Sequence, residues 1–284
     1  MPNAPRPNPD DLHLYIIGPH WGLPSISPFG IKLATWLRVA GIPHRLGFQD
    51  DPRKGPKRKS PWIVENGRAM GDSELIVTHL SRTRGIDVDG TLGDRERAVG
   101  LLLRRTFEEH FHQILEYALW ILDEGWKQSH VHFDFLPALV RPMLKKIIRS
   151  DAHKESRVRG IGRHDREEIA RMAAADLQAA AVLLGDQPFF FGARPTTTDC
   201  SLYGFLSHTL WAPIPYFAQD EIKRHPNLVE YCERMRARYW SEPAAEGPWH
   251  PPKAEPEKSV QRGTGVPNPT IEGDMRSGST THGR

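Results

Sequence analysis

Residues 60–80, SPWIVENGRAMGDSELIVTHL, constrain the fold of this chain more than any other stretch. Asn66 and Gly67 separate two short apolar segments, and an Asn-Gly pair in that position is a strong signal for a β-hairpin. Asp72 and Ser73 follow at the start of a helical pattern, where both residue types are good N-caps. The stretch predicts a small sheet that ends beside a helix N-terminus. Backbone N–H groups and a hydroxyl at such a place can bind a carboxylate.

The residues before this stretch predict a β-α-β unit. Residues 12–17 are typical of a strand, and a helical pattern begins after Ser27 and Pro28, which suit the N-cap and the first helical position. Gly41 is a stop signal for that helix, and residues 43–48 are typical of a second strand. Two strands joined by one helix are expected to be parallel, with a right-handed crossover. We expect residues 12–84 to form one α/β domain.

The second half of the chain predicts helices and no strands. Residues 85–93 are rich in Gly and Asp and are expected to be a linker to an all-helical domain at 94–240. Helices are predicted at 94–125, 135–148, 165–184 and 227–239, and residues 196–199 open a further apolar helix. The two ends, 1–11 and 241–284, are rich in Pro, Gly and polar residues and are expected to be disordered.

Composition excludes several classes of function. The formal net charge of +3 and the pI of about 8.9 are too modest for a nucleic-acid-binding surface, so no nucleic-acid partner is expected. Cys200 and Cys232 lack the spacing of a zinc site or a redox dithiol, and so low a cysteine count favours a reducing compartment. The N-terminus lacks the apolar core of a signal peptide, and no apolar run is long enough to span a bilayer. We expect a soluble cytoplasmic protein without a membrane anchor.

Acidic and histidine side chains on the long predicted helix do not predict a metal site. Residues two apart on a helix point in different directions, so His110 and His112 are poor joint ligands. The other residues of suitable type are Glu108, Glu109, His130 and His132. We expect no bound metal, and instead expect Phe107, His110 and Phe111 to line a substrate cleft between the domains.

Three positions suggest chemistry from their residues alone. A cis bond before Pro61 would turn the backbone N–H and C=O of Ser60 toward an extended peptide, although a proline here can also be simple punctuation. Asp72 and Ser73 can be a plain helix cap, or can hold the ammonium and carboxylate groups of an amino acid. The Ser27 hydroxyl can be only a cap, or can donate a hydrogen bond to a thiolate at the positive end of the helix.

Together these motifs resemble the cytosolic glutathione S-transferase family. The β-α-β start, the strand after Ser60-Pro61, the Asn-Gly hairpin and the acidic-serine helix start occur in the family's order, and the resemblance covers about residues 12–239. SPFGIKLATWLRVAGIPH, SPWIVENG and DSELIVTHL are most similar to the branch of failed axon connections proteins and metaxins. Residues 196–199 match the family's capping box in its second domain. The resemblance implies a thioredoxin-like N-terminal domain, an all-helical glutathione S-transferase C-terminal domain, and glutathione as co-substrate.

The resemblance also assigns residues to glutathione binding. It implies that Pro61 is the family's cis-proline and that the backbone of Ser60 pairs with the cysteinyl part of the tripeptide. Asp72 and Ser73 match the acidic-serine pair that holds its γ-glutamyl end. Ser27 matches the catalytic position of the serine- and cysteine-type members.

Other positions depart from the family pattern or leave alternatives open. Gly30 stands where many members have Ser or Cys. The charged loop at 50–59 has no clear helix, and it is either a solvated connection or a cationic rim that attracts an anion. Candidates within it for binding the glycyl end of glutathione are Lys57 and Lys59. The alternatives for activating the thiol are Ser25 and Tyr15, the latter inside a predicted strand.

The function expected from the resemblance is transfer of the glutathione thiol to a small electrophile, as in detoxification, by a homodimer. The alternative is a non-catalytic, soluble adaptor or scaffold that has kept the fold, as the similarity to metaxins allows. Titration with glutathione separates the two.

Overall fold

The computed structural model describes residues 12–133, 136–214 and 216–251, so the disorder predicted for 1–11 and 252–284 lies outside the described residues. The first half contains β1 (Leu12–Ile16), α1 (Pro28–Val39), β2 (His44–Phe48), β3 (Trp62–Glu65), β4 (Arg68–Gly71) and α2 (Ser73–Arg84). β1 pairs in parallel with β2 and antiparallel with β3, which forms the predicted hairpin with β4. The strands and helices predicted in this half are confirmed, with ends that differ by at most two residues.

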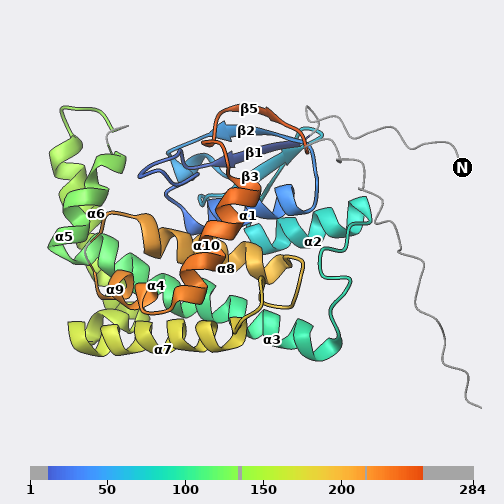
Figure 1. The fold of residues 1–284 in the computed structure, drawn as a ribbon. Coiled ribbons are helices and arrows are strands. Elements are labelled where there is room, and N and C mark those ends of the chain that lie inside the picture. The colour runs from blue at the N-terminus through green and yellow to red at the C-terminus, as the bar shows by residue number, and fades with distance from the viewer. Residues whose placement is uncertain (1–11, 134–135, 215, 252–284) are drawn as a thin grey trace, which may run out of the picture. The chain divides into compact units, whose positions relative to one another are not determined.

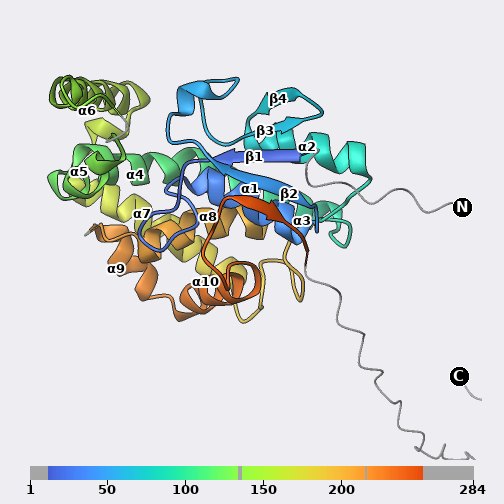
Figure 2. The same ribbon diagram turned by 90° about the horizontal axis from the view of Figure 1, so that it is seen from above.

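The sheet buries one face against helices. Leu12, Leu14 and Ile16 of β1 are fully buried, whereas the alternating His13 and Tyr15 are half-buried, as the two-residue period of a strand requires. α1 and α2 lie on the same side of the sheet (Figure 1). Seen from above, the strands follow the order β4-β3-β1-β2-β5 (Figure 2). The first half is therefore the predicted α/β layer.

A fifth strand corrects the prediction that disorder starts at residue 241. β5 (Gly247–Trp249) pairs antiparallel with β2, and the ring of Trp249 lies 5.2 Å from that of His44. The Arg38 guanidinium lies 3.6 Å from the ring centroid of Trp240 and 5.4 Å from that of Trp249. These aromatic contacts hold the segment against α1 and β2, although its composition resembles that of a disordered tail.

Helices make up the second half. They are α3 (Asp94–Arg105), α4 (His112–Glu116), α5 (Asp123–Ser129), α6 (Arg141–Arg159), α7 (Arg166–Leu184), α8 (Thr197–Trp211), α9 (Phe217–Lys223) and α10 (Pro226–Tyr239). Two π-helical turns, η3 (Thr106–Phe111) and η4 (Tyr117–Ile121), flank α4, and 3-10 turns lie at Pro52–Lys54 (η2), His130–Phe133 (η5) and Ile161–Arg163 (η6). None of the described helices is long and apolar enough to cross a bilayer.

Two helix predictions need correction. The helix predicted at 94–125 ends at Ile121, because Leu122 has an extended backbone (φ −66°, ψ 139°) from which α5 starts anew. The helix predicted at 135–148 begins only at Arg141, with Pro142 in its first turn, and continues to Arg159. The helices predicted at 165–184, after 196–199 and at 227–239 are confirmed as α7, α8 and α10. α9 has only seven residues, too few to produce a clear helical pattern.

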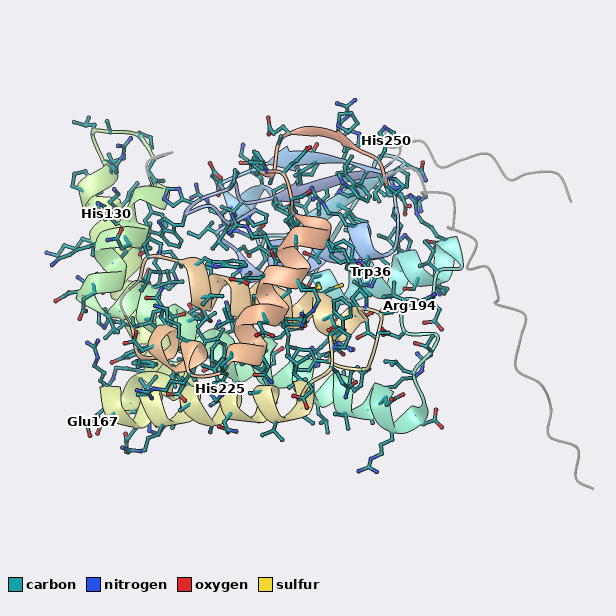
Figure 3. All side chains as sticks on the ribbon, in the orientation of Figure 1. Trp36, His130, Glu167, Arg194, His225 and His250 are labelled. Atoms are coloured by element: carbon teal, nitrogen blue, oxygen red, sulfur yellow. The ribbon has the colours of Figure 1, made fainter. Side chains whose placement is uncertain are left out.

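A continuous hydrophobic core joins the sheet to the helical half. α1 packs closely on α8, where Gly204 is required because a Cβ would lie 2.4 Å from the carbonyl oxygen of Pro28. Trp36, labelled in Figure 3, is fully buried and donates from Nε1 to Thr197 Oγ1 at 3.2 Å. Because both halves share this core, the domain bounds at the 85–93 linker stay a prediction.

Candidate functional site

The segments singled out by the sequence meet at one end of the sheet. Trp62 pairs with Gly71, so Pro61 and Asp72 stand side by side where β3 begins and β4 ends. β1 runs antiparallel to β3, so its carboxyl end also lies at this edge, and the loop that follows leads to Ser27. The N-termini of α1 and α2 therefore open toward the same region.

A cavity of about 740 Å³ lies between this end of the sheet and the helical half. Ser27 and Ser60 line it, together with mostly apolar side chains that include Ile17, Ile26, Phe29, Phe48, Leu115, Leu119 and Trp120. The bond between Ser60 and Pro61 is cis, which confirms the cis-proline that the resemblance implies. The buried Ser60 hydroxyl has no hydrogen-bond partner among the described residues. A small molecule with polar and apolar parts fits such a lining.

The prediction that Phe107, His110 and Phe111 line the cleft is wrong, because other residues of this helical segment face the cavity. Phe107 and Phe111 are fully buried core residues, and His110 Nδ1 lies 2.6 Å from Asp176 Oδ2 on α7. The cavity is lined instead by residues of α4 and η4, among them His112 and Glu116. A π-turn has more residues per turn than an α-helix, so η3 rotates the following face relative to the predicted register.

Of the three candidates for activating a thiol, Ser27 is the one that lines the cavity. Its Oγ accepts a hydrogen bond from the Gly30 N–H at 3.4 Å, which confirms its role as N-cap of α1 and leaves its O–H able to donate. Ser25 is fully buried, donates to the Ile17 carbonyl at 2.6 Å and accepts from the Ser27 N–H at 3.1 Å. Ser25 is thus committed to holding the loop in place.

Tyr15 points to the other face of the sheet. Its ring stacks on Trp62 with centroids 5.3 Å apart, and it alternates with the buried side chains of β1. It is not among the residues that line the cavity. Tyr15 is therefore a packing residue of that face.

Gly30 explains one departure from the family pattern. A Cβ at this position would lie 2.9 Å from Ser25 Oγ and 3.3 Å from Ile16 Cβ. The hydrogen bonds of Ser25 fix the loop so close to α1 that a side chain at residue 30 would displace it. Glycine at position 30 therefore allows Ser25 to hold the loop that positions Ser27.

Asp72 is the N-cap of α2. Its Oδ1 accepts from the N–H groups of Glu74 and Leu75, both at 3.1 Å, and its backbone has φ of 86°. Its Oδ2 lies 3.7 Å from Lys57 Nζ. Ser73 is 6% exposed, and neither it nor Asp72 lines the cavity itself. The two residues lie at the same end of the sheet as Ser60, which lines the cavity together with Lys59 of the charged loop.

Burial makes His112 neutral near pH 7. It lowers the pKa of His112 to about 4, with the ring edge-on to Phe29 and Phe205 at 4.9 and 6.0 Å. Burial also raises the pKa of Glu116, against the opposing effect of Arg159, whose Nη1 lies 3.0 Å from Glu116 Oε2. A neutral His112 adds no positive charge to the cavity. An anion beside α1 can therefore be stabilised by the helix N-terminus, by the Ser27 hydroxyl and by the charge of Lys59, which also lines the cavity.

A buried ion-pair network, which the sequence does not reveal, connects the two helices of this site, α1 and α2, to the helical half. Lys32 of α1 is fully buried, and its Nζ lies 2.9 Å from Glu74 Oε2 and 2.6 Å from Glu108 Oε1. Ser201 donates to Glu108 at 2.6 Å, and Arg104 donates to Glu74 at 3.2 Å. The network ties the first turn of α2 to the helical half. Lys32 stands among apolar residues of a predicted helix, and the sequence around it does not indicate that Glu74 and Glu108 are its partners.

The side chains that were considered as metal ligands do not lie together, because each contacts different neighbours. His110 pairs with Asp176, His112 contacts aromatic rings, and His130 lies on the arm formed by α5 and α6 (Figure 3). The side chain of His132 lies outside the described part of the structure. Within the described residues, no group of three His, Cys, Asp or Glu side chains could hold a metal ion.

Sequence comparisons show the family to which the chain belongs. The model of the glutathione S-transferase N-terminal domain matches residues 28–126, and that of the C-terminal domain matches residues 173–235. The chain is 32% identical over 238 residues to the isoprene-epoxide glutathione S-transferase of Rhodococcus sp. (strain AD45), covering 80% of this chain and 99% of that protein. The chain therefore belongs to the glutathione S-transferase family.

Two further relatives belong to the branch that the sequence motifs indicate. Failed axon connections of Drosophila melanogaster is 30% identical over 273 residues, and the match covers 87% of this chain but only 64% of that longer protein. Metaxin-1 of Macaca fascicularis is 25% identical over 259 residues, covering 86% of this chain and 80% of the relative. The resemblance is confirmed, and it extends also to the glutathione S-transferase of Rhodococcus.

Proposed function

We propose that this protein binds glutathione along the sheet edge and transfers its thiol to a small electrophile in the 740 Å³ cavity. The observation that carries the proposal is the convergence of Ser27, the cis Ser60-Pro61 segment and the Asp72-Ser73 helix start at one end of the sheet. The backbone of Ser60 pairs with the peptide middle of glutathione. The start of α2 holds the γ-glutamyl end, where helix N–H groups favour a carboxylate.

Ser27 is the group proposed to favour the thiolate. Its oxygen accepts from the Gly30 N–H, which leaves the O–H able to donate to the sulfur, and the N-terminus of α1 adds a favourable field. The thiolate attacks an electrophilic carbon held against the apolar wall of the cavity. An epoxide is the first class to test, because the bacterial relative bears that activity in its name. There the C–S bond forms as the ring C–O bond breaks, and the alkoxide takes a proton from water.

Three serine variants test these roles. Ser73→Ala is expected to weaken glutathione binding in titration calorimetry about threefold to tenfold, the worth of one lost hydrogen bond. Ser27→Ala is expected to keep most of the affinity and to lower the rate of conjugation of glutathione with a small epoxide, measured by mass spectrometry. Ser81→Ala, on the same helix α2 but near its far end, is the matched control and should change neither quantity. If Ser27→Ala reacts as fast as the native protein, Ser27 is only a cap.

The second candidate function is a non-catalytic adaptor, favoured by the similarity to failed axon connections and metaxin-1. It predicts no heat of binding with glutathione at millimolar concentration. A glutathione transferase predicts saturable heat and a conjugate. The same titration on the native chain therefore distinguishes the two functions.

Dimer formation and a cytoplasmic location complete the proposal. Leu75 of α2 and Leu101 and Leu102 of α3 are 51%, 43% and 68% exposed on the helices that follow the glutathione site. Apolar side chains left in water at neighbouring helices suit contact with a second copy. Cys200 and Cys232 are buried free thiols, which suits a reducing compartment. Light scattering of Leu102→Glu against the native chain tests the dimer, which the charge should dissociate.

A further inference from the structure

The helix α6 differs from α7 in how much of it is buried. Both helices have 19 residues, but α7 buries six of its side chains and α6 buries none. Figure 1 shows α6 on the side of the molecule opposite to α2, where it forms an arm with α5. It also lies between the stretches that match the two glutathione S-transferase domain models, which are residues 28–126 and 173–235. A long helix with no buried side chain needs another reason for its composition.

Apolar side chains form a stripe on the outer face of α6. Met143, Ile147 and Val158 are 59%, 47% and 80% exposed, and their spacings of 4 and 11 residues place them on one face of the helix. Leu139, in the turn before the helix, is 95% exposed. A single apolar side chain at a surface is ordinary, but three in a row after an almost bare leucine indicate an interaction surface. These four residues are the apolar stripe.

Basic side chains flank the apolar stripe. The helix has seven Lys or Arg and two acidic residues, so its net charge is +5, whereas that of the whole chain is +3. Arg149 faces inward and pairs with Asp123 at 2.6 Å. Lys146 and Arg157 are exposed and lie 11 residues apart, so they share one flank of the stripe. Neither of them forms an ion pair with a described carboxylate.

The acidic residues of α6 do not cancel this charge. Asp151 lies 3.2 Å from Lys154, and Glu155 lies 2.5 Å from Arg159, so each carboxylate pairs with a cation of the same helix. Both carboxylates are on the flank opposite to Lys146. The flank that carries Lys146 is therefore positive, and it lies directly beside exposed apolar side chains. This pattern is typical of a helix that lies in the surface of an anionic bilayer.

Two other occupants of this face are disfavoured. A second copy bound through α6 would bring two helices of net charge +5 together, and like charges repel. A protein that wraps around a basic helix cannot enclose α6, because its inner side packs on η4 and η6. A bilayer surface needs only the outer face.

We propose that α6 binds the surface of an anionic phospholipid bilayer. The helix lies parallel to the surface, the apolar stripe enters the boundary between headgroups and acyl chains, and Lys146 and Arg157 contact lipid phosphates and carboxylates. The contact is peripheral and spans nothing. It does not depend on the proposed transferase function, since no residue of the glutathione site takes part.

Cosedimentation of the full chain with lipid vesicles tests the proposal. The native protein should bind phosphatidylcholine vesicles that contain about 30% phosphatidylserine at about 0.05 M salt, and should be released at about 0.5 M. Vesicles of phosphatidylcholine alone should bind much less. The double variant Lys146→Gln, Arg157→Gln should bind about 25-fold more weakly, because each basic side chain at an anionic surface contributes about fivefold. The double variant Met143→Ser, Ile147→Ser should bind at least about tenfold more weakly.

The matched control is the double variant Arg82→Gln, Arg194→Gln. It removes two exposed charges on the side away from α6, where Figure 1 labels α2 and Figure 3 labels Arg194. It should bind the anionic vesicles as the native protein does. All three double variants should keep the native circular dichroism spectrum, because every substituted side chain is exposed.

Four results would overturn the proposal. The first is no binding of the native protein to the anionic vesicles at low salt. The second is an equal loss of binding in the control, and the third is unchanged binding after Met143→Ser, Ile147→Ser. The fourth is binding to soluble polyglutamate without binding to vesicles, which would assign α6 to an acidic protein instead.

Discussion

Replacing Lys32 by methionine is expected to destabilise the fold strongly. Methionine fills nearly the same volume, so the change removes a charge without opening a large cavity. It leaves Glu108, 5% exposed, with the Ser201 hydroxyl at 2.6 Å and Arg105 only at 4.0 Å. Removing one partner of a buried ion pair costs about 3–5 kcal/mol. At about 2–4 °C per kcal/mol for a chain of this size, the melting temperature should fall by about 6–20 °C.

A double-mutant cycle isolates the pair. Glu108→Gln alone should also destabilise, because it leaves the Lys32 ammonium buried with only Glu74. The double variant Lys32→Met, Glu108→Gln removes both charges and keeps an amide for Ser201. We expect it to be more stable than the sum of the single changes by about 0.5–3 kcal/mol, the coupling range for groups in contact. Urea unfolding followed by circular dichroism measures each free energy.

Lys154 provides the matched control. It pairs with Asp151 at 3.2 Å on α6, but its side chain is 74% exposed. Lys154→Met should therefore cause no measurable change in unfolding free energy. The account of Lys32 is wrong if Lys32→Met behaves like Lys154→Met, or if the double variant is as unstable as simple addition requires.

Two further predictions concern packing and pH. Gly204→Ala should lower the unfolding free energy by about 1–3 kcal/mol or more, because its Cβ would meet the Pro28 carbonyl of α1 at 2.4 Å; an unchanged urea midpoint would contradict the close packing of α1 on α8. Burial lowers the pKa of His44 from 6.5 to about 4, so the unfolded chain binds a proton that the folded chain does not between these values. The free energy of unfolding should therefore fall as pH decreases from about 6.5 to 4, by at most about 3.4 kcal/mol from this side chain. His44→Gln should reduce the dependence of the unfolding free energy on pH and leave the part that is due to His112. An equal pH dependence in the variant and the native protein would refute the role given to His44.

The α/β half could be predicted from sequence because its signals are local. Asn66-Gly67 fixes the hairpin, Ser27 and Asp72 cap their helices, and alternating apolar residues define β1. Each of these depends on neighbours within a few residues. The helix starts at 166 and 197 have capping boxes of the same local kind, and the helix start at 226 has proline at its first position.

The cavity lining could not be predicted, because it depends on distant contacts and on helix register. The π-turn η3 sets the register in which His112 and Glu116, and not Phe107 and His110, line the cavity together with Ser27. The sequence shows helical periodicity there but not an added residue in a turn. Likewise β5 forms through the stacking of Arg38 and His44 on tryptophans about 200 residues away in the chain, which no local pattern records.

Between Ser25 and Ser27 the sequence alone does not choose. The structure separates them because Ser25 has both its donor and an acceptor site in use within the loop, whereas Ser27 faces the cavity. The same packing explains Gly30. Sequence motifs can thus locate the site, but the hydrogen bonds decide which hydroxyl is able to act.

The thiol pKa of bound glutathione tests the central claim most directly. Thiolate absorbs in the ultraviolet, so a pH titration of the saturated complex against free glutathione reports the ionisation. We predict that the native protein lowers the thiol pKa by about 1–2 units from the usual value near 8.5. In Ser27→Ala the thiol pKa should lie close to that usual value again. A bound thiol that titrates like free glutathione, or equally in both proteins, would contradict the role given to Ser27 and the N-terminus of α1.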